Sequence, residues 1–169
     1  MSALRVQKVR AGETYFIPAG LPHAIGKGIL IAEIQQNCDL TYRVYDYDRR
    51  QADGTLRQLH VEKANDVIRP FSEEAINAIR YSRATPTDPQ TVLADCTYFR
   101  TEKLTLAKNA YTLLQNGYMR HLLCIAGEGE ITYNGCALPF CRGDSILLPA
   151  ALADCTLTGD ATVIFTTAY

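Results

Sequence analysis

The amino-acid sequence predicts an all-β protein of the sandwich or barrel type. Short runs of β-branched and aromatic residues recur along the chain, separated by Gly, Pro, Asn and Asp, which is typical of these folds. A strand-and-turn pattern also occurs twice, and only one segment has a helical pattern. The predicted strands are Thr14–Ile17, Ile29–Gln35, Thr41–Asp46, Leu56–Val61, Cys96–Leu104, His121–Ala126, Gly129–Tyr133, Ser145–Leu148 and Ala161–Thr166.

The one helical candidate is Ser72–Tyr81. Ser72 suits the N-cap position, Glu73 and Glu74 suit the first turn, and apolar residues recur at helical spacing after them. The alternative is an extended linker.

The repeated pattern covers residues 12–23 and residues 143–154. Each copy has a glycine, an acidic residue, an apolar run that ends at proline, and then alanine and a small residue. This order predicts a turn, a buried strand and a stop at the rim of a sheet. The copies differ at their last position, where the first has His23 and the second has Asp154.

A boundary between two domains is predicted at Thr85–Gln90, where two prolines in four residues oppose both helix and strand ladder. We therefore expect one domain over residues 1–84 and a second over residues 85–169.

Composition excludes some classes of protein. The 169 residues carry a formal net charge of −1, which favours neither nucleic acid nor an anionic membrane as a partner. No apolar run approaches the roughly 18 residues that span a membrane, and the first twelve residues have no apolar signal core. We expect a cytoplasmic protein whose six cysteines are small buried residues with free thiols.

The first copy of the repeat resembles a known motif. Gly12, Pro18, Gly20 and His23 have the spacing of the second conserved cupin motif, in which a histidine points into a jelly-roll barrel as a metal ligand. The stretch from His23 to Arg49 resembles the corresponding stretch of bacterial type I mannose-6-phosphate isomerases. Further segments of the chain are similar to that family: Arg57–His60, Glu62–Ala64, Gly127–Gly129, Pro139–Phe140 and Gly143–Pro149.

The resemblance implies a cupin jelly-roll fold, with a partial first cupin over residues 1–84 followed by a second, degenerate cupin. It also implies interconversion of mannose 6-phosphate and fructose 6-phosphate. That reaction moves a proton between C1 and C2, so it needs an acid and base, a cation for the developing oxyanion, and positive charge for the phosphate.

Four residues match the family's catalytic and metal-binding positions. His23 resembles its histidine zinc ligand, Glu33 its proton carrier and Arg43 its catalytic arginine. Asp39 matches an aspartate that orients the arginine. The alternatives from the residues themselves are ordinary ion pairs for Glu33 and Arg43 and an Asx-type turn for Asp39.

Two cations are predicted to bind substrate. Arg49, rather than Arg50, is placed to meet the phosphate, and a solvated loop charge is the alternative. Lys63 also fits the family pattern, as does His60, and both could instead be structural.

Most of the family's zinc ligands have no counterpart here. The resemblance implies a glutamine, two histidines and a glutamate, yet no Gln-x-His precedes His23. His121 lies in the second cupin, which we expect to be structural and free of metal. The chain is therefore expected to need a partner, either a second copy in a homodimer or a missing N-terminal half.

Three functions stay open at this level. The first is an isomerase that is incomplete as a lone chain. The second is a non-catalytic, self-associating truncated cupin that binds a sugar phosphate. The third is a cupin acting on another small molecule, with a metal site made across a dimer.

Overall fold

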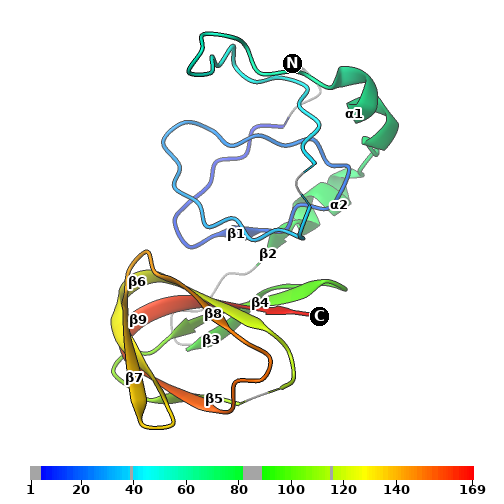
Figure 1. The fold of residues 1–169 in the computed structure, drawn as a ribbon. Coiled ribbons are helices and arrows are strands. Elements are labelled where there is room, and N and C mark those ends of the chain that lie inside the picture. Colours follow the sequence, from blue (N-terminus) through cyan, green and yellow to red (C-terminus); the bar gives the residue numbers. More distant parts are fainter. Residues whose placement is uncertain (1–4, 39, 82–88, 115) are drawn as a thin grey trace. The chain divides into compact units, whose positions relative to one another are not determined.

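The computed structural model describes residues 5–38, 40–81, 89–114 and 116–169 (Figure 1). Two compact units are present. Met1–Tyr15 and Arg80–Tyr169 make the first, and Phe16–Ile79 makes the second. The predicted boundary segment, Thr85–Gln90, lies mostly outside the described residues, so the division near residue 84 stays a prediction.

The first unit contains all the strands of the described chain (Figure 1). They are β1 (Thr14–Tyr15), β2 (Arg80–Tyr81), β3 (Gln90–Asp95), β4 (Phe99–Thr105), β5 (Tyr111–Leu113), β6 (Arg120–Tyr133), β7 (Cys136–Cys141), β8 (Ser145–Leu148) and β9 (Cys155–Ala168). The short strands β1 and β2 pair with each other, and the other seven form one antiparallel sheet. The predicted all-β class is confirmed.

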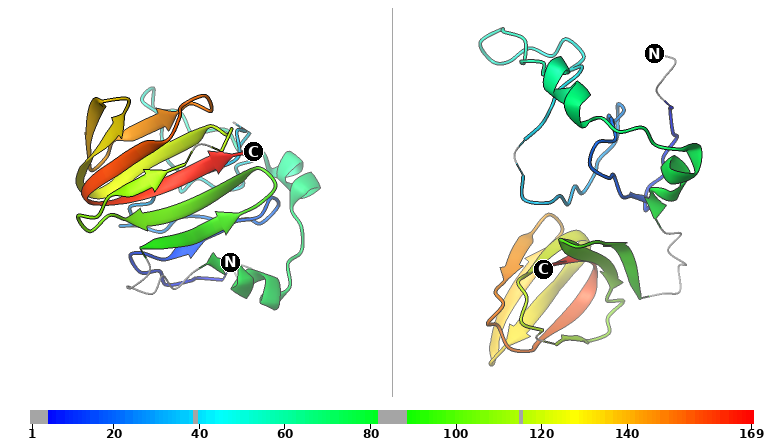
Figure 2. Two further views of the ribbon diagram at one scale, coloured as in Figure 1. Left: turned by 90° about the horizontal axis from the view of Figure 1, so that it is seen from below. Right: turned by 90° about the vertical axis from the view of Figure 1, so that its right-hand side faces the viewer.

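Two long strands turn this sheet into a sandwich. Early in its length β6 pairs with β8, and later it pairs with β7, while β9 lies beside it throughout. In the same way, β9 pairs first with β5 and then with β4. Both strands therefore pass from one layer to the other, and Figure 2 shows the sheet curling about its interior.

A close approach of backbones explains where β6 and β9 bend. Gly159 of β9 has φ +128°, and a Cβ placed there would meet the Cα of Gly129 and the carbonyl of Glu128 on β6. The sequence's Gly127–Gly129 motif lies at this crossing. A register shift between Cys124 and Ala126 adds to the bend.

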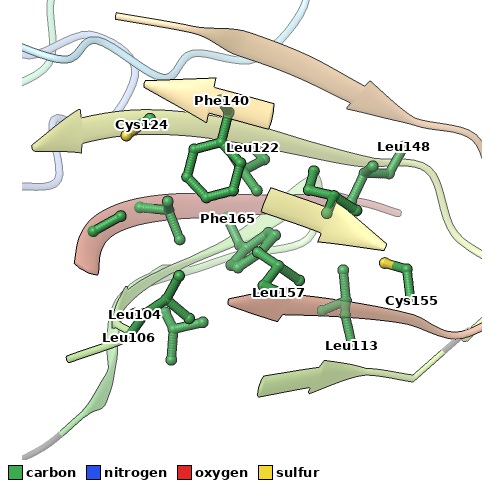
Figure 3. Packing of buried hydrophobic residues seen from close by; sticks show 13 residues of the cluster. Leu104, Leu106, Leu113, Leu122, Cys124, Phe140, Leu148, Cys155, Leu157 and Phe165 are labelled. Carbon is green, nitrogen blue, oxygen red and sulfur yellow. The ribbon is translucent and has the colours of Figure 1, made fainter. Parts of the chain in front are cut away.

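The core of the first unit fills the space between the layers. Leu122, Leu157 and Val163 are fully buried, and Phe140 and Phe165 pack with them (Figure 3). Burial of such side chains contributes roughly 1.5–3 kcal/mol each and is the main stabilising term for this unit.

The second unit contains two helices, α1 (Val61–Val67) and α2 (Glu73–Ala78), and no strand among its described residues. The prediction of a helix after Ser72 is confirmed, because the Ser72 hydroxyl accepts a hydrogen bond from the Ala75 amide at 3.2 Å. The helix α1 was not predicted from the sequence. No helix of the described chain is long and apolar enough to cross a membrane.

Three predicted strands are wrong. Ile29–Gln35 and Thr41–Asp46 are irregular, and Leu56–Val61 contributes only an isolated bridge between Leu56 and Arg50. The physical reason is that a strand needs neighbours to pair with its backbone groups. Large apolar residues of these segments are left exposed, with Leu30 at 88% and Tyr45 at 57%.

Candidate functional site

A glycine turn sets the position of His23 in the second unit. The Leu21 amide donates to the Pro18 carbonyl at 3.2 Å, and the Gly20 carbonyl accepts from the Arg69 amide at 3.0 Å. Gly20 has φ +87°, and a Cβ there would lie 2.7 Å from the Val67 carbonyl oxygen. Only glycine fits this turn, which therefore packs against the segment after α1.

The imidazole of His23 is exposed, and its Nδ1 lies 3.0 Å from the Leu21 carbonyl oxygen. Since a carbonyl only accepts, Nδ1 is the donor, and in the neutral ring the lone pair is then on Nε2. Metal-binding histidines commonly have this arrangement, with one ring nitrogen held by a carbonyl and the other facing the metal.

The structure brings His60 to the backbone of Arg43. The His60 amide donates to the Arg43 carbonyl at 2.7 Å, and the Arg43 amide donates to His60 Nδ1 at 3.3 Å. The Tyr42 ring lies beside the imidazole, with centroids 6.3 Å apart. His60, directly before α1, thereby fixes the backbone that carries Arg43.

The other predicted site residues are not joined to this pair. Glu33, Arg49 and Lys63 are exposed, and no hydrogen bond or ion pair links His23, Glu33, Arg43, Arg49 and Lys63 to one another. Asp39 lies outside the described residues. The roles assigned to these six residues stay predictions.

Asp46 is a candidate that the sequence analysis missed. Its Oδ1 lies 3.5 Å from Nη1 of Arg57, and its side chain is only 14% exposed. Its Oδ2 is buried without a hydrogen-bond partner in the described part of the chain. A buried carboxylate oxygen of this kind is a place for a cation or a donor from another molecule. The acidic and aromatic alternation around Asp46 was the only signal in the sequence.

A zinc site is not assembled by the residues that the structure describes. No group of three His, Cys, Asp or Glu side chains lies close enough together to hold a metal ion. His121, in the first unit, instead has Nε2 2.7 Å from the Ser145 hydroxyl. The ligands present therefore do not fit the four-coordinate zinc site that the family resemblance implies.

A cavity of about 210 Å³ lies in the first unit, lined by residues of β3, β4, β5, β6 and β9 and of the segment between β5 and β6. Its lining includes Glu102, Tyr111 and Arg120 and none of the site residues predicted from the sequence.

Comparison with known proteins gives matches along most of the chain. Residues 89–168 match the family described as mannose-6-phosphate isomerase, cupin domain. The mannose-6-phosphate isomerase ManA of Bacillus subtilis is 39% identical over 95% of the chain and 50% of its own length. The mannose-6-phosphate isomerase of Streptococcus mutans is 33% identical over 92% of the chain and 48% of its own length. The chain thus spans about half the length of the curated relatives that it matches.

Solved structures similar to this chain include isomerases of the same kind. The mannose 6-phosphate isomerase of Bacillus subtilis superposes with a TM-score of 0.64 at 29% identity, covering 78% of this chain and 41% of that one. A phosphomannose isomerase of Salmonella typhimurium superposes with a TM-score of 0.55 at 13% identity, covering 68% of this chain and 29% of that one, which supports the fold alone.

Proposed function

Because the chain belongs to the mannose-6-phosphate isomerase family of cupin proteins, we propose that it serves in the interconversion of mannose 6-phosphate and fructose 6-phosphate as part of an isomerase. The matches are consistent with a C-terminal half of such an enzyme. The observation that carries the proposal is the 39% identity to ManA over 95% of the chain, which extends well beyond the cupin domain at residues 89–168.

In this proposal the second unit supplies groups for proton transfer. Glu33 carries the proton between C1 and C2, and Arg43 stabilises the negative charge that develops on the sugar oxygens. The hydrogen bonds between Arg43 and His60 support this role, since they hold the arginine's backbone in one place. Asp39 orients the guanidinium.

Two further cations bind the substrate phosphate. Arg49 and Lys63 are both exposed and carry no ion pair in the described part of the chain, so their charge is available to an anion. Asp46 and Arg57 lie near Arg49 in sequence, and they form an ion pair with each other in which their charges balance.

Zinc, when bound, would polarise the sugar oxygens as a Lewis acid. His23 is the residue of this chain placed to contribute a ligand, through Nε2. One histidine does not hold zinc firmly, since a site needs three or four ligands. The remaining ligands would come from residues outside this 169-residue sequence.

The same conclusion follows from exposed apolar side chains in the second unit. Leu30, Leu40 and Tyr45 are all more than half exposed. They suit burial against strands of a complementary half, or against a second copy of this chain.

The test measures isomerase activity with added zinc, first for the chain alone and then with the half of ManA that this chain does not match. We expect the chain alone to have little isomerase activity, and we expect a large gain in activity when the unmatched half of ManA is added. Arg43→Ala should lower kcat in the mixture by at least about a hundredfold, the loss typical of removing one charge-stabilising group.

Arg142→Ala is the matched control, because Arg142 is an exposed arginine in the turn between β7 and β8. It should leave the rate unchanged. Full activity of the Arg43→Ala mixture would contradict the catalytic assignment. No activity in any mixture that forms a complex would favour the non-catalytic cupin.

A further inference from the structure

The cavity in the first unit lies where the interior of the sandwich changes from apolar to polar. On three neighbouring strands, a buried apolar residue has a polar residue two positions away on the same face. These pairs are Leu104 and Glu102 on β4, Leu122 and Arg120 on β6, and Phe165 and Thr167 on β9. The polar members all line the cavity.

Strand pairing places two of these polar residues, Arg120 and Thr167, side by side. Arg120 is paired with Thr167 in the β6–β9 ladder, and Glu102 is paired with Phe165 in the β4–β9 ladder. Charged side chains on a core-facing surface are costly unless they have partners or bind something. The partners of the charged residues Glu102 and Arg120 therefore need to be identified.

Hydrogen bonds hold the acidic side of the cavity in place. The Tyr111 hydroxyl donates to Gln90 Oε1 at 3.1 Å, and Gln90 Nε2 donates to Glu102 Oε1 at 3.2 Å. Arg100 bridges the carboxylates of Glu102 and Asp95, at 3.2 Å and 2.8 Å, so its charge is balanced. The chain Tyr111–Gln90–Glu102 is thus a fixed row of donors and acceptors.

Arg120, on the other side of the cavity, has no carboxylate partner of this kind in the described part of the chain. Its Nη2 donates to the Leu114 carbonyl at 2.6 Å, which positions the guanidinium but does not neutralise it. No ion pair joins Arg120 to a carboxylate within the described ranges. A guanidinium stays charged at any physiological pH and offers several N–H donors in one plane, which suits a carboxylate or a phosphate.

We propose that this cavity binds a small hydroxylated anion, of the size of one sugar unit with a single carboxylate or phosphate group. Arg120 receives the anionic group, Glu102 and Gln90 bond the hydroxyls, and Phe165 provides an apolar wall. The volume of about 210 Å³ is below the roughly 300–1,000 Å³ of pockets for drug-sized ligands, which favours a ligand this small. The inference does not depend on the proposed isomerase function.

The test is a titration of the ¹⁵N-labelled full chain followed by NMR, with gluconate, fructose 6-phosphate, mannose and inorganic phosphate as probes. We expect gluconate or fructose 6-phosphate at millimolar concentration to shift the amide signals of Glu102, Tyr111, Arg120 and Thr167. Mannose lacks the anionic group that Arg120 would bind, and inorganic phosphate lacks the sugar hydroxyls. Each should therefore bind at least about tenfold more weakly than the better anionic sugar.

The proposal is overturned if neither anionic sugar moves these signals. It is also overturned if mannose or inorganic phosphate binds as tightly as the better anionic sugar. Shifts confined to residues 16–79 would report the proposed substrate site of the second unit and count against the cavity.

Arg120→Gln should weaken binding of the better probe by at least about tenfold, since it removes the charge and keeps a donor for the Leu114 carbonyl. Arg142→Ala removes the same charge at an exposed turn and should bind as the parent does. Tyr111→Phe removes only the hydroxyl that orients Gln90, and it should weaken binding several-fold in a folded chain. Unchanged affinity in both cavity variants contradicts the assignment.

Discussion

The six cysteines show that the type of a residue does not by itself predict whether it is buried. All six are free in the structure, as expected from the sequence. The expected burial holds for Cys124 and Cys155, but it is wrong for the exposed Cys38, Cys136 and Cys141. Alternation along a strand decides which side of the sheet a residue faces, and its register is not visible in composition.

Burial has a chemical consequence at Cys124. Desolvation raises the pKa of its thiol, so less of the reactive thiolate forms at neutral pH. We predict that iodoacetamide at pH 7.5 modifies Cys124 of β6 at least about tenfold more slowly than the exposed Cys136 at the start of β7. The rate at Cys124 should rise as the pH approaches its raised pKa.

Peptide mapping by mass spectrometry measures both rates in one sample. In denaturant the two cysteines should react alike, since the difference comes from the folded chain. Equal rates in the native protein would show that β6 opens more often than its buried position implies.

For the candidate site too, the sequence predicted which residues take part but not which contacts they make. Sequence resemblance named His23, Glu33, Asp39, Arg43, Arg49 and Lys63 by residue type and spacing. Spacing does not give the partners, so the contact between Arg43 and His60 and the buried oxygen of Asp46 could not be predicted. The cavity at Arg120 was missed for the same reason, because its lining comes from strands far apart in sequence.

At the scale of elements, strands with local signals were predicted and strands set by their neighbours were not. The strand β8 has the predicted bounds, Ser145–Leu148. The strand β7 was missed because it contains Pro139, which opposes a strand ladder. Proline is tolerated there because β7 lies at the edge of the sheet and pairs only with β6.

The single strand β6 was predicted as two, separated at Gly127 and Glu128. Glycine usually marks a turn, whereas here it lets two backbones cross closely. The sequence pattern is the same in both cases, and only the position of β9 distinguishes them.

The crossing gives a prediction for stability. Gly159→Ala should lower the free energy of unfolding by at least about 2 kcal/mol, since the new Cβ meets the backbone of β6 and φ is unfavourable. Gly135→Ala is the control, with φ +75° and open space around the Cβ. It should cost roughly 1–2 kcal/mol, the cost of the backbone conformation alone. Urea denaturation measures both, and equal losses would contradict a close crossing at Gly159.

At the scale of the whole molecule, the two units have different sources of stability. The first has a continuous buried core. In the second, Ala64 is the one buried hydrophobic residue among those described, and many large apolar side chains are exposed. Apolar surface left exposed on this scale is typical of a region that packs against further protein.

We therefore predict that the lone chain associates at micromolar concentrations, so that light scattering after size exclusion gives a mass of a dimer or larger. Replacing Leu30 and Leu40 together by lysine should shift it toward the monomer, because both are exposed in the second unit. Leu147→Lys, at a 58% exposed position of β8, is the control and should not. A monodisperse monomer for the parent chain would be the contrary result.

The central position of β9 has a consequence for the order of events during synthesis. This strand lies between β4 and β6 and also pairs with β5, yet all three are made before it. Until residues 155–168 leave the ribosome, β4, β5 and β6 lack β9 as a pairing partner. The core also lacks the side chains of Val163 and Phe165. The jelly roll must therefore form late and from distant contacts, a slow kind of folding during which chaperones have time to bind.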